Sequence, residues 1–270
     1  MHYTVNYSYD FTNQVVYPNL ASMFAVDGVV FVPVDITNYT CDALDCTYNA
    51  DVTNVSVPLS VEYGGKAYSV IEVNPYTFYG NIALESASLA NNGDIQRNLF
   101  VDCSNLKELT ITSLGDITDN AFNRFTSLEH VEISNQGDIG STAFGACSAL
   151  KTVIISNNGS IGSGAFINCS ALETALIYNK GNIRFDAFNG CSALTDVSIG
   201  KDVTYICGSA FYGCSALSEI VIPEEISAIQ SSAFGNCSNL TTVLYNAKNC
   251  TVYQDWLLLL SGKTFAKKIN

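Results

Sequence analysis

Cysteines recur at one position of a repeated octapeptide, and thiols so placed could do chemistry. The segment AFGACSAL at 143–150 returns as AFINCSAL at 165–172, AFNGCSAL at 187–194 and AFYGCSAL at 210–217. A thiolate can act as a nucleophile or metal ligand, whereas a buried thiol behaves as a small apolar side chain. Six of the ten cysteines lie three residues after the Phe of such a segment: Cys103, Cys147, Cys169, Cys191, Cys214 and Cys237.

The surrounding sequence favours a structural role for this cysteine row. Phe125 takes the same position in one copy, and an essential nucleophile or ligand would be lost from that unit. A disulfide between successive members is unfavourable, because parallel Cβ vectors do not aim the two sulfur atoms at each other. We therefore predict that the row fills the protein interior. Cys41 and Cys46 are spaced closely enough for a local disulfide across a turn, and two free thiols fit their spacing equally well.

Other residues that carry chemistry are few. The chain has two histidines, His2 at the terminus and His130, for which we predict an exposed imidazole. The sequence contains no Ser-His-Asp or Cys-His-Asn combination, no zinc-ligand spacing and no phosphate-binding loop. We therefore expect no enzymatic activity and no cofactor.

A row of aspartates is the remaining polar pattern, and each member directly follows a glycine. Asp, Ser and Asn are favoured in turns, where their side chains hydrogen-bond to nearby backbone groups. Stacked carboxylates could alternatively bind Ca²⁺ weakly, because that ion takes several oxygen ligands. We favour turn chemistry and keep a calcium site as the alternative. The row consists of Asp94, Asp116 and Asp138, and continues as Ser160 and Asn182.

Charge and hydropathy exclude two classes of partner. The 270 residues include 12 basic and 25 acidic ones, and the resulting net charge of −13 repels nucleic-acid phosphates. No apolar run approaches the ~20 residues that a membrane-spanning helix needs. The longest candidate is WLLLL at 256–260. We predict no nucleic-acid partner and no transmembrane segment in this chain.

The cysteines and aspartates belong to a longer repeat, in which a phenylalanine returns at nearly constant intervals. A leucine follows each repeat Phe after six residues, and apolar residues follow at nine, eleven and seventeen in most copies. The period lies within the range of ~20–29 residues that is typical of a solenoid in which each turn carries one short strand. The alternation at the end of the frame LxxVxI fits a strand with one buried face. The phenylalanines are Phe78, Phe100, Phe122, Phe144, Phe166, Phe188, Phe211 and Phe234.

The frame AFxxCxxLxxVxI, preceded by YGGKAYSVIEVNPYTF at 63–78, resembles the BspA-type leucine-rich repeat family over about residues 55–250. The resemblance implies a leucine-rich repeat solenoid, a β-rich, right-handed β/α superhelix. Its parallel sheet would form one face and short helical or 3-10 turns the other. The chain departs from the family pattern in its middle copies, where a shorter turn contains Gly93, Gly115, Gly137, Gly159 and Gly181.

Three regions are predicted along the chain. Residues 1–68 do not keep the period and form a β-rich N-terminal cap, with hairpins at GVVFVPV (28–34) and at Gly64-Gly65. Residues 69–250 form the solenoid of about eight repeats. Residues 251–270 lose the repeat and form a C-terminal cap.

The resemblance also implies a function and a location. Members of the family occur on bacterial or protist surfaces, and several are adhesins. It therefore implies a secreted or cell-surface module that binds a host matrix, serum or cell-surface protein on the concave sheet face. The alternative is a structural spacer or stalk in a larger surface protein. An enzyme with a site between the N-terminal hairpins and the stack is a less favoured alternative.

The outward positions of the strands predict where a partner would bind. Ten residues after the Phe, four of the last five side chains are apolar although they have no packing reason to be so. A row of neighbouring apolar side chains at ~4.8 Å spacing forms a patch typical of interaction sites. Alternatively, another segment such as the C-terminal cap covers the row. The predicted centre is Ile154, Leu176, Tyr178, Val221 and Leu244, with Glu132 and His130 on the rim.

Overall fold

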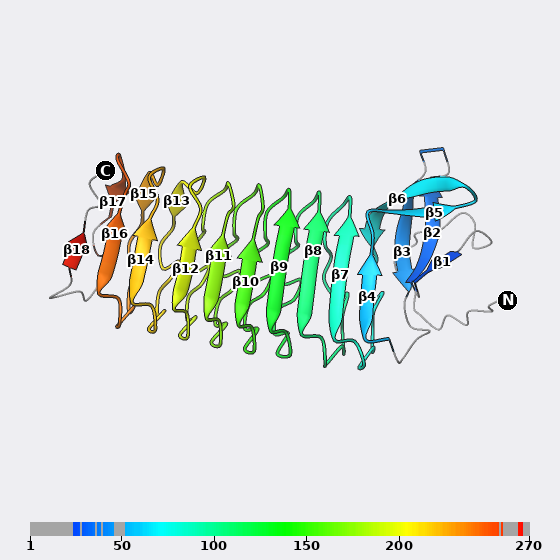
Figure 1. Cartoon of the computed structure of the whole chain (residues 1–270), viewed down its shortest axis with the longest axis horizontal. Helices are drawn as coiled ribbons and strands as arrows, with labels where there is room; N and C mark the ends of the chain where they lie inside the picture. The colour runs from blue at the N-terminus through cyan, green and yellow to red at the C-terminus, as the bar shows by residue number, and fades with distance from the viewer. Residues whose placement is uncertain are drawn as a thin grey trace.

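The computed structural model is a solenoid of parallel strands, capped at its N-terminal end by a separate sheet (Figure 1). It describes residues 24–27, 29–35, 37–38, 40–45, 52–253, 255 and 264–266. The predicted solenoid and its parallel sheet are thus confirmed. His2 and Cys46 lie outside the described residues.

A seven-stranded parallel sheet forms the main face, in the order β12-β11-β10-β9-β8-β7-β4. β4, the earliest of these strands in the chain, lies within the range predicted as the N-terminal cap. The parallel sheet therefore begins before residue 69. Successive strands from β7 onward pair at an offset of one repeat, as in Ile111 beside Ile133. The strands are β4 (Asn54–Val57), β7 (Ser86–Asn91), β8 (Glu108–Ser113), β9 (His130–Asn135), β10 (Thr152–Ile155), β11 (Thr174–Ile177) and β12 (Asp196–Ile199).

Two three-stranded sheets continue the solenoid toward the C-terminus. The first has the order β14-β16-β18 and extends the main face, while the second has the order β13-β15-β17. Thr264 pairs with Thr242, again one repeat earlier in the chain. The solenoid pairing therefore reaches into the range predicted as a C-terminal cap. The strands are β14 (Glu219–Ile222), β16 (Thr242–Tyr245), β18 (Thr264–Ala266), β13 (Tyr205–Ile206), β15 (Ala228–Ile229) and β17 (Thr251–Val252).

The N-terminal sheet has the order β1-β2-β3-β6-β5 and contains both predicted hairpins. β1 and β2 pair antiparallel, and β5 and β6 pair antiparallel around Gly64 and Gly65. Both glycines have positive φ, 58° and 73°, which a residue with a Cβ adopts only under strain. The strands are β1 (Phe24–Val26), β2 (Val29–Asp35), β3 (Thr40–Asp45), β5 (Ser60–Tyr63) and β6 (Lys66–Val73).

The repeat phenylalanines stack along the interior of the solenoid. From Phe144 to Phe234, neighbouring ring centroids lie 5.1–5.2 Å apart and their planes differ by 2–6°. The leucines and isoleucines of the repeat are buried in the same interior, except for the half-buried Ile199. Burying each such side chain contributes about 1.5–3 kcal/mol before conformational entropy is subtracted.

Hydrogen-bonded turns, not helices, form the face opposite the sheet. The described residues contain no helix of any kind, so the predicted helical or 3-10 turns are wrong. In each turn the residues two before and two after the Phe have positive φ, for example Asn120 (59°) and Arg124 (61°) around Phe122. A right-handed helix requires negative φ at every residue, so this backbone cannot form one.

The middle turns approach each other so closely that they require glycine. A Cβ built on Gly137 would lie 2.7 Å from backbone atoms of Gly115, and one on Gly181 would lie 2.5 Å from those of Gly159. Buried asparagines next to these glycines bind the turn carbonyls: Asn135 Nδ2 donates to Gly137 O at 2.9 Å. The sequence reasoning recognised the glycines but missed these asparagines.

Candidate binding surfaces

The predicted apolar row lies on the outward face of the sheet, because side chains alternate between the two faces along each strand. β10 places Ile154 directly beside Leu176 of β11, and beside Glu132 of β9 on its other side. Ile154 and Leu176 are half-buried, while Glu132 is exposed. This part of the row is a contiguous patch with a charged neighbour.

The structure divides the row into two apolar pairs. Ser198 of β12 pairs with Leu176 and presents a polar side chain at this point. Beyond it, Val221 of β14 pairs with Leu244 of β16, in the other sheet. Val221 is 39% exposed. The sequence pattern therefore placed the residues on one face with Ser198 among them, but did not show that the two apolar pairs lie in different sheets.

Tyr178 and His130 lie at opposite ends of the strands. Tyr178 directly follows β11 and is 49% exposed. His130 begins β9, is exposed, and pairs with Thr152 of β10. The exposed imidazole predicted for His130 is confirmed. A binding role for any residue of the row remains a prediction.

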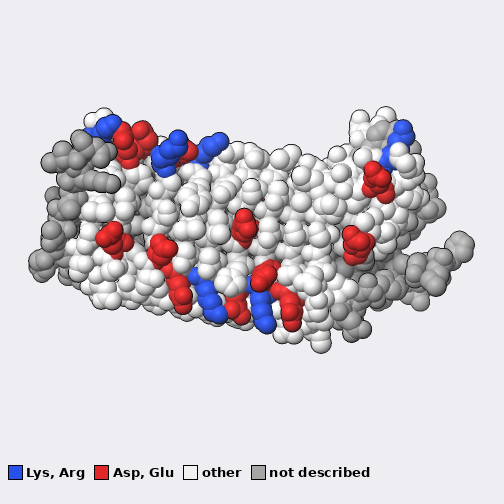
Figure 2. Space-filling view, in the orientation of Figure 1, with Lys and Arg blue, Asp and Glu red and all other residues white. Residues whose placement is uncertain are grey.

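Charged side chains are few over the middle of the sheet face. Figure 2 shows acidic and basic residues gathered along the edge where the strands begin and near β13 to β17, with few over the middle of the sheet. At the first of these edges Lys151 forms an ion pair with Glu129 of the preceding turn. The pairing lowers the pKa of the Glu129 carboxyl and raises the pKa of the Lys151 ammonium group.

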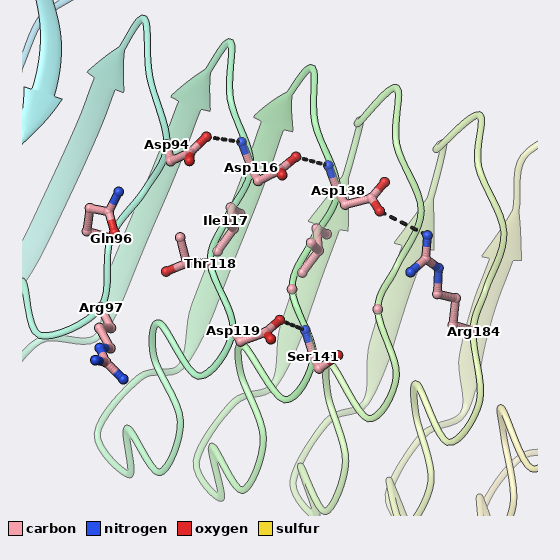
Figure 3. A pocket seen from close by; sticks show the side chains of 13 residues that line it. Asp94, Gln96, Arg97, Asp116, Ile117, Thr118, Asp119, Asp138, Ser141 and Arg184 are labelled. Atoms are coloured by element: carbon pink, nitrogen blue, oxygen red, sulfur yellow. Dashed lines mark hydrogen bonds and ion pairs between the residues drawn. The ribbon is translucent and has the colours of Figure 1, made fainter.

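A groove of about 500 Å³ runs over the aspartate row (Figure 3). Asp94 Oδ1 accepts a hydrogen bond from the Asp116 amide at 2.8 Å, and Asp116 Oδ1 accepts one from the Asp138 amide at 2.7 Å. Asp138 in turn accepts from the Ser160 amide at 2.7 Å. The aspartates thus bind the backbone of the following turn, 22 residues on, and not the nearby backbone groups that the turn interpretation predicted.

The remaining carboxylate oxygens of the groove do not converge on one point. Asp138 Oδ2 lies 3.0 Å from Arg184 Nη2, and Asp119 Oδ1 accepts from the Ser141 amide at 2.6 Å. Within the described part of the chain, no group of three or more His, Cys, Asp or Glu residues could hold a metal ion. The described geometry therefore offers no support for the alternative calcium site.

The thiols of the cysteine row donate to backbone carbonyl groups. Cys147 Sγ lies 3.2 Å from Phe122 O, and Cys169 Sγ lies 3.1 Å from Phe144 O. A hydrogen bond with the Cys169 thiol, together with burial, raises the pKa of Cys147 well above its ordinary value. All six members are buried. Since the thiolate is the reactive form, thiols so placed are poor nucleophiles and poor metal ligands.

The N-terminal sheet holds a buried carboxylate that the sequence analysis missed. Asp42 of β3 is 6% exposed and lies opposite Glu72 of β6. Burial is the main cause that raises the pKa of Asp42, and the negative charge of Glu72 adds to it, so that the pKa is about 7. A hydrogen bond with Asn74 opposes the shift. Cys41, next to it, carries a buried free thiol whose pKa burial raises to about 12.

These features define a leucine-rich repeat solenoid with one parallel sheet and tight turns opposite it. The family model for the BspA type leucine rich repeat region matches residues 71–191 and 159–258, in six copies. The matched residues make up more than half of the chain, and the chain belongs to this family. None of the curated proteins matches it significantly.

Solved structures of other repeat proteins resemble the chain. The leucine-rich repeat protein TpLRR of T. pallidum is 23% identical, with a TM-score of 0.52, over 72% of this chain and 90% of that one, and it shares the fold. A leucine-rich repeat protein from Bacteroides ovatus is 16% identical, with a TM-score of 0.33, over 84% and 90% of the two chains. A leucine-rich cell surface protein from Faecalibacterium prausnitzii is 16% identical, with a TM-score of 0.31, over 85% and 94%. No helix in the described residues is long and apolar enough to cross a membrane.

Proposed function

We propose that the chain is a non-enzymatic, adhesin-like module of a secreted or cell-surface protein. It binds a partner protein through the outward face of its parallel sheet. Membership of the BspA-type family supports this location and this class of function. The partner is a host matrix, serum or cell-surface protein.

One observation carries the choice of surface: Ile154 and Leu176 lie side by side on an outward face although the core does not need them. Each side chain is half-buried by its neighbours within this chain. Contiguous exposed apolar side chains bordered by charge are typical of protein interaction sites. Tyr178 adds an exposed aromatic ring at the end of β11, and tyrosine is enriched among residues that dominate binding energy.

A binding screen with matched variants tests the proposal. The full chain is screened against purified host matrix and serum proteins, and each ligand found is tested against Ile154→Ser/Leu176→Ser. We expect at least about a tenfold loss of affinity, because truncation at the centre of an interface commonly costs more than 1 kcal/mol. The melting temperature should change little, and Thr110→Ser, at the same outward position of β8, should leave binding unchanged.

Two results would contradict the proposed surface. Unchanged affinity in the double variant would place the binding site elsewhere. A large fall in melting temperature would show that the two side chains belong to the core. If no partner protein binds at all, the chain is better explained as a spacer within a larger surface protein.

A further inference from the structure

One junction of the solenoid lacks the backbone hydrogen bonds that join the other described turns. On the turn face, in all the other turns from Phe78 to Phe211, the amides of the Phe and of the residues two before and two after it donate to the next turn. At the Phe122 turn, Phe122 N donates to Ala143 O at 2.7 Å, and Arg124 N to Gly145 O at 2.7 Å. The same contact recurs from Phe166 N to Ala187 O at 2.7 Å.

The junction between the Phe100 and Phe122 turns has none of these three bonds. The amides of Asn98, Phe100 and Asp102 have no hydrogen-bond acceptor among the residues that the structure describes. The corresponding carbonyl groups of the next turn, at Asp119, Ala121 and Asn123, accept no hydrogen bond there either. Three donors and three acceptors of the backbone are therefore left without partners on the two sides of one junction.

We attribute the separation to two side chains in these turns that are larger than the repeat favours. Leu99 stands where the later turns have the small Ala143 or Ala165, and it is buried. Phe125 stands where they have cysteine. Excess volume in a packed interior forces backbone shifts.

The phenylalanine rings at this junction are also farther apart and tilted. The ring centroids of Phe100 and Phe122 lie 6.2 Å apart, and their planes differ by 33°. On the sheet side the junction is intact, because β8 and β9 pair along their whole length, from Glu108 beside His130 to Ser113 beside Asn135. The turns are separated on one face only.

The separated turns line a cavity of about 420 Å³. This volume falls within the range of small-molecule sites, ~300–1,000 Å³. Arg124 and Asp102 are exposed at the cavity, and neither forms an ion pair with another described residue. The half-buried ring of Phe125 supplies an apolar surface. The other lining residues include Asn98, Asn120, Asn123 and Thr126.

We propose that this inter-turn cleft, lined by residues 98–104 and 120–127, binds a neutral saccharide. A hydroxyl group both donates and accepts hydrogen bonds, so sugar hydroxyls can pair with the free amides on one wall and the free carbonyl groups on the other. The Arg124 guanidinium offers further donors. Asn98 and Asn123 contribute Oδ1 acceptors, because their Nδ2 groups donate to Tyr76 Oη and Thr142 O. The Phe125 ring can contact the apolar C–H face of a sugar.

The geometry disfavours other ligands. An anion would meet the Asp102 carboxylate, and a cation would meet the Arg124 guanidinium. An inserted peptide strand would need two strand spacings, ~9.6 Å between the turns. The rings at the junction are 6.2 Å apart, against 5.1 Å between Phe144 and Phe166. The extra 1.1 Å at this junction is far less than an inserted strand needs.

The experiment uses backbone amide spectra of the full, ¹⁵N-labelled chain. Glucose, galactose, mannose, N-acetylglucosamine and maltotriose are added separately, and the amide resonances of Asn98, Phe100 and Asp102 are followed. We expect saturable shifts of these resonances with at least one of the sugars. Arg184→Ala, which alters the aspartate groove, should give the same titration as the natural chain.

The decisive variant closes the cleft by restoring the repeat pattern. In Leu99→Ala/Phe125→Cys the three missing hydrogen bonds should form, so the amides of residues 98, 100 and 102 should exchange more slowly with solvent and sugar shifts should disappear. If this variant misfolds, as judged by the amide protection of β8 and β9, Arg124→Ala replaces it. Arg124→Ala should weaken binding about tenfold or more, because hydrogen bonds from a charged group contribute ~1.5–3 kcal/mol.

Two outcomes would overturn the proposal. If none of the five sugars shifts these resonances, the cleft holds water only. If the shifts persist unchanged in the closed variant, or in Arg124→Ala where that variant replaces it, the sugar binds elsewhere on the chain.

Discussion

Two junctions of the same solenoid differ in how they hold neighbouring turns together. Between Phe144 and Phe166 the rings are parallel within 4°, and the turns are joined by a regular set of backbone hydrogen bonds. Between Phe100 and Phe122 the rings are tilted by 33° and those bonds are missing. The difference shows that the sheet alone sets the register, while side-chain volume decides whether the opposite face closes.

Removing a stacked ring should have the largest effect, and it should differ between the two junctions. Phe166→Ala should lower the free energy of unfolding by about 3–5 kcal/mol, because the cavity it leaves lies between two closely stacked rings. Phe100→Ala should cost less, since on one side its ring is not stacked but only tilted against Phe122 at 6.2 Å and edge-on to Phe125 at 6.4 Å. Urea denaturation followed by circular dichroism measures both, and equal losses would contradict the comparison.

A pH titration of stability tests a feature of the N-terminal sheet that neither junction has. Asp42 is the one buried carboxylate among the described residues, and its pKa rises from 3.8 to about 7. The folded state then holds a proton that the unfolded state releases, so stability is full below pH ~4 and falls as pH rises toward 7. The two pKa values limit the effect to roughly 4 kcal/mol.

The control for this titration is Asp42→Asn, which removes the charge and keeps the shape. Its free energy of unfolding should vary much less between pH 4 and 8 than that of the natural chain. Glu72 and Asn74 face Asp42 and remain in place. An equally steep dependence in the variant would show that another group is responsible.

Adding a Cβ where two regular turns approach closely should have a smaller effect. A Cβ at Gly137 would lie 2.1 Å from Asp116 Oδ1 and 2.7 Å from the Gly115 backbone, so Gly137→Ala must push two turns apart. We expect a loss of about 1–3 kcal/mol in the free energy of unfolding. Ser134→Ala, on the exposed face of β9, is the control and should change it by less than ~0.5 kcal/mol. A variant as stable as the natural chain would mean that the turns already have room for a side chain.

Thiol labelling should reveal the smallest difference. Cys147 and Cys169 lie between fully bonded turns, and we expect a thiol reagent to reach them only on global unfolding. Cys103 lies in the turn that borders the open junction, so local opening should expose it several-fold faster. Mass spectrometry of labelled peptides gives the rates, and identical rates for the three thiols would show that the open junction does not lower local stability.

The repeat allowed the core to be predicted almost residue by residue. Each Phe, Leu, Cys and Ile of the frame was expected inside, and the structure buries nearly all of them. The outward position of Ile154 and Leu176 also followed from strand alternation. The division of the row between two sheets did not, because it depends on β12 being the last strand of the seven-stranded sheet.

The sequence alone established the period, one short strand in each turn and the buried face. These follow from local rules, because every turn meets the same environment and each inner position must be apolar in nearly every copy. The helical turns were a wrong prediction because they came from the family resemblance. The residues themselves adopt positive φ twice in each turn.

Only the tertiary structure decided the features that depend on two distant segments at once. Asp42 is buried because β3 pairs with β6, which follows only after β4 and β5 in the chain. We attribute the open junction to Leu99 and Phe125, which replace an alanine and a cysteine of the repeat in neighbouring turns. The Phe125 ring lies 6.4 Å from the Phe100 ring across this junction. Each of the two residues is larger than the residue that the repeat favours at its position, and the folded stack places the two in neighbouring turns. The hydrogen bonds between the turns are lost because a packed interior cannot absorb both side chains without moving the backbone.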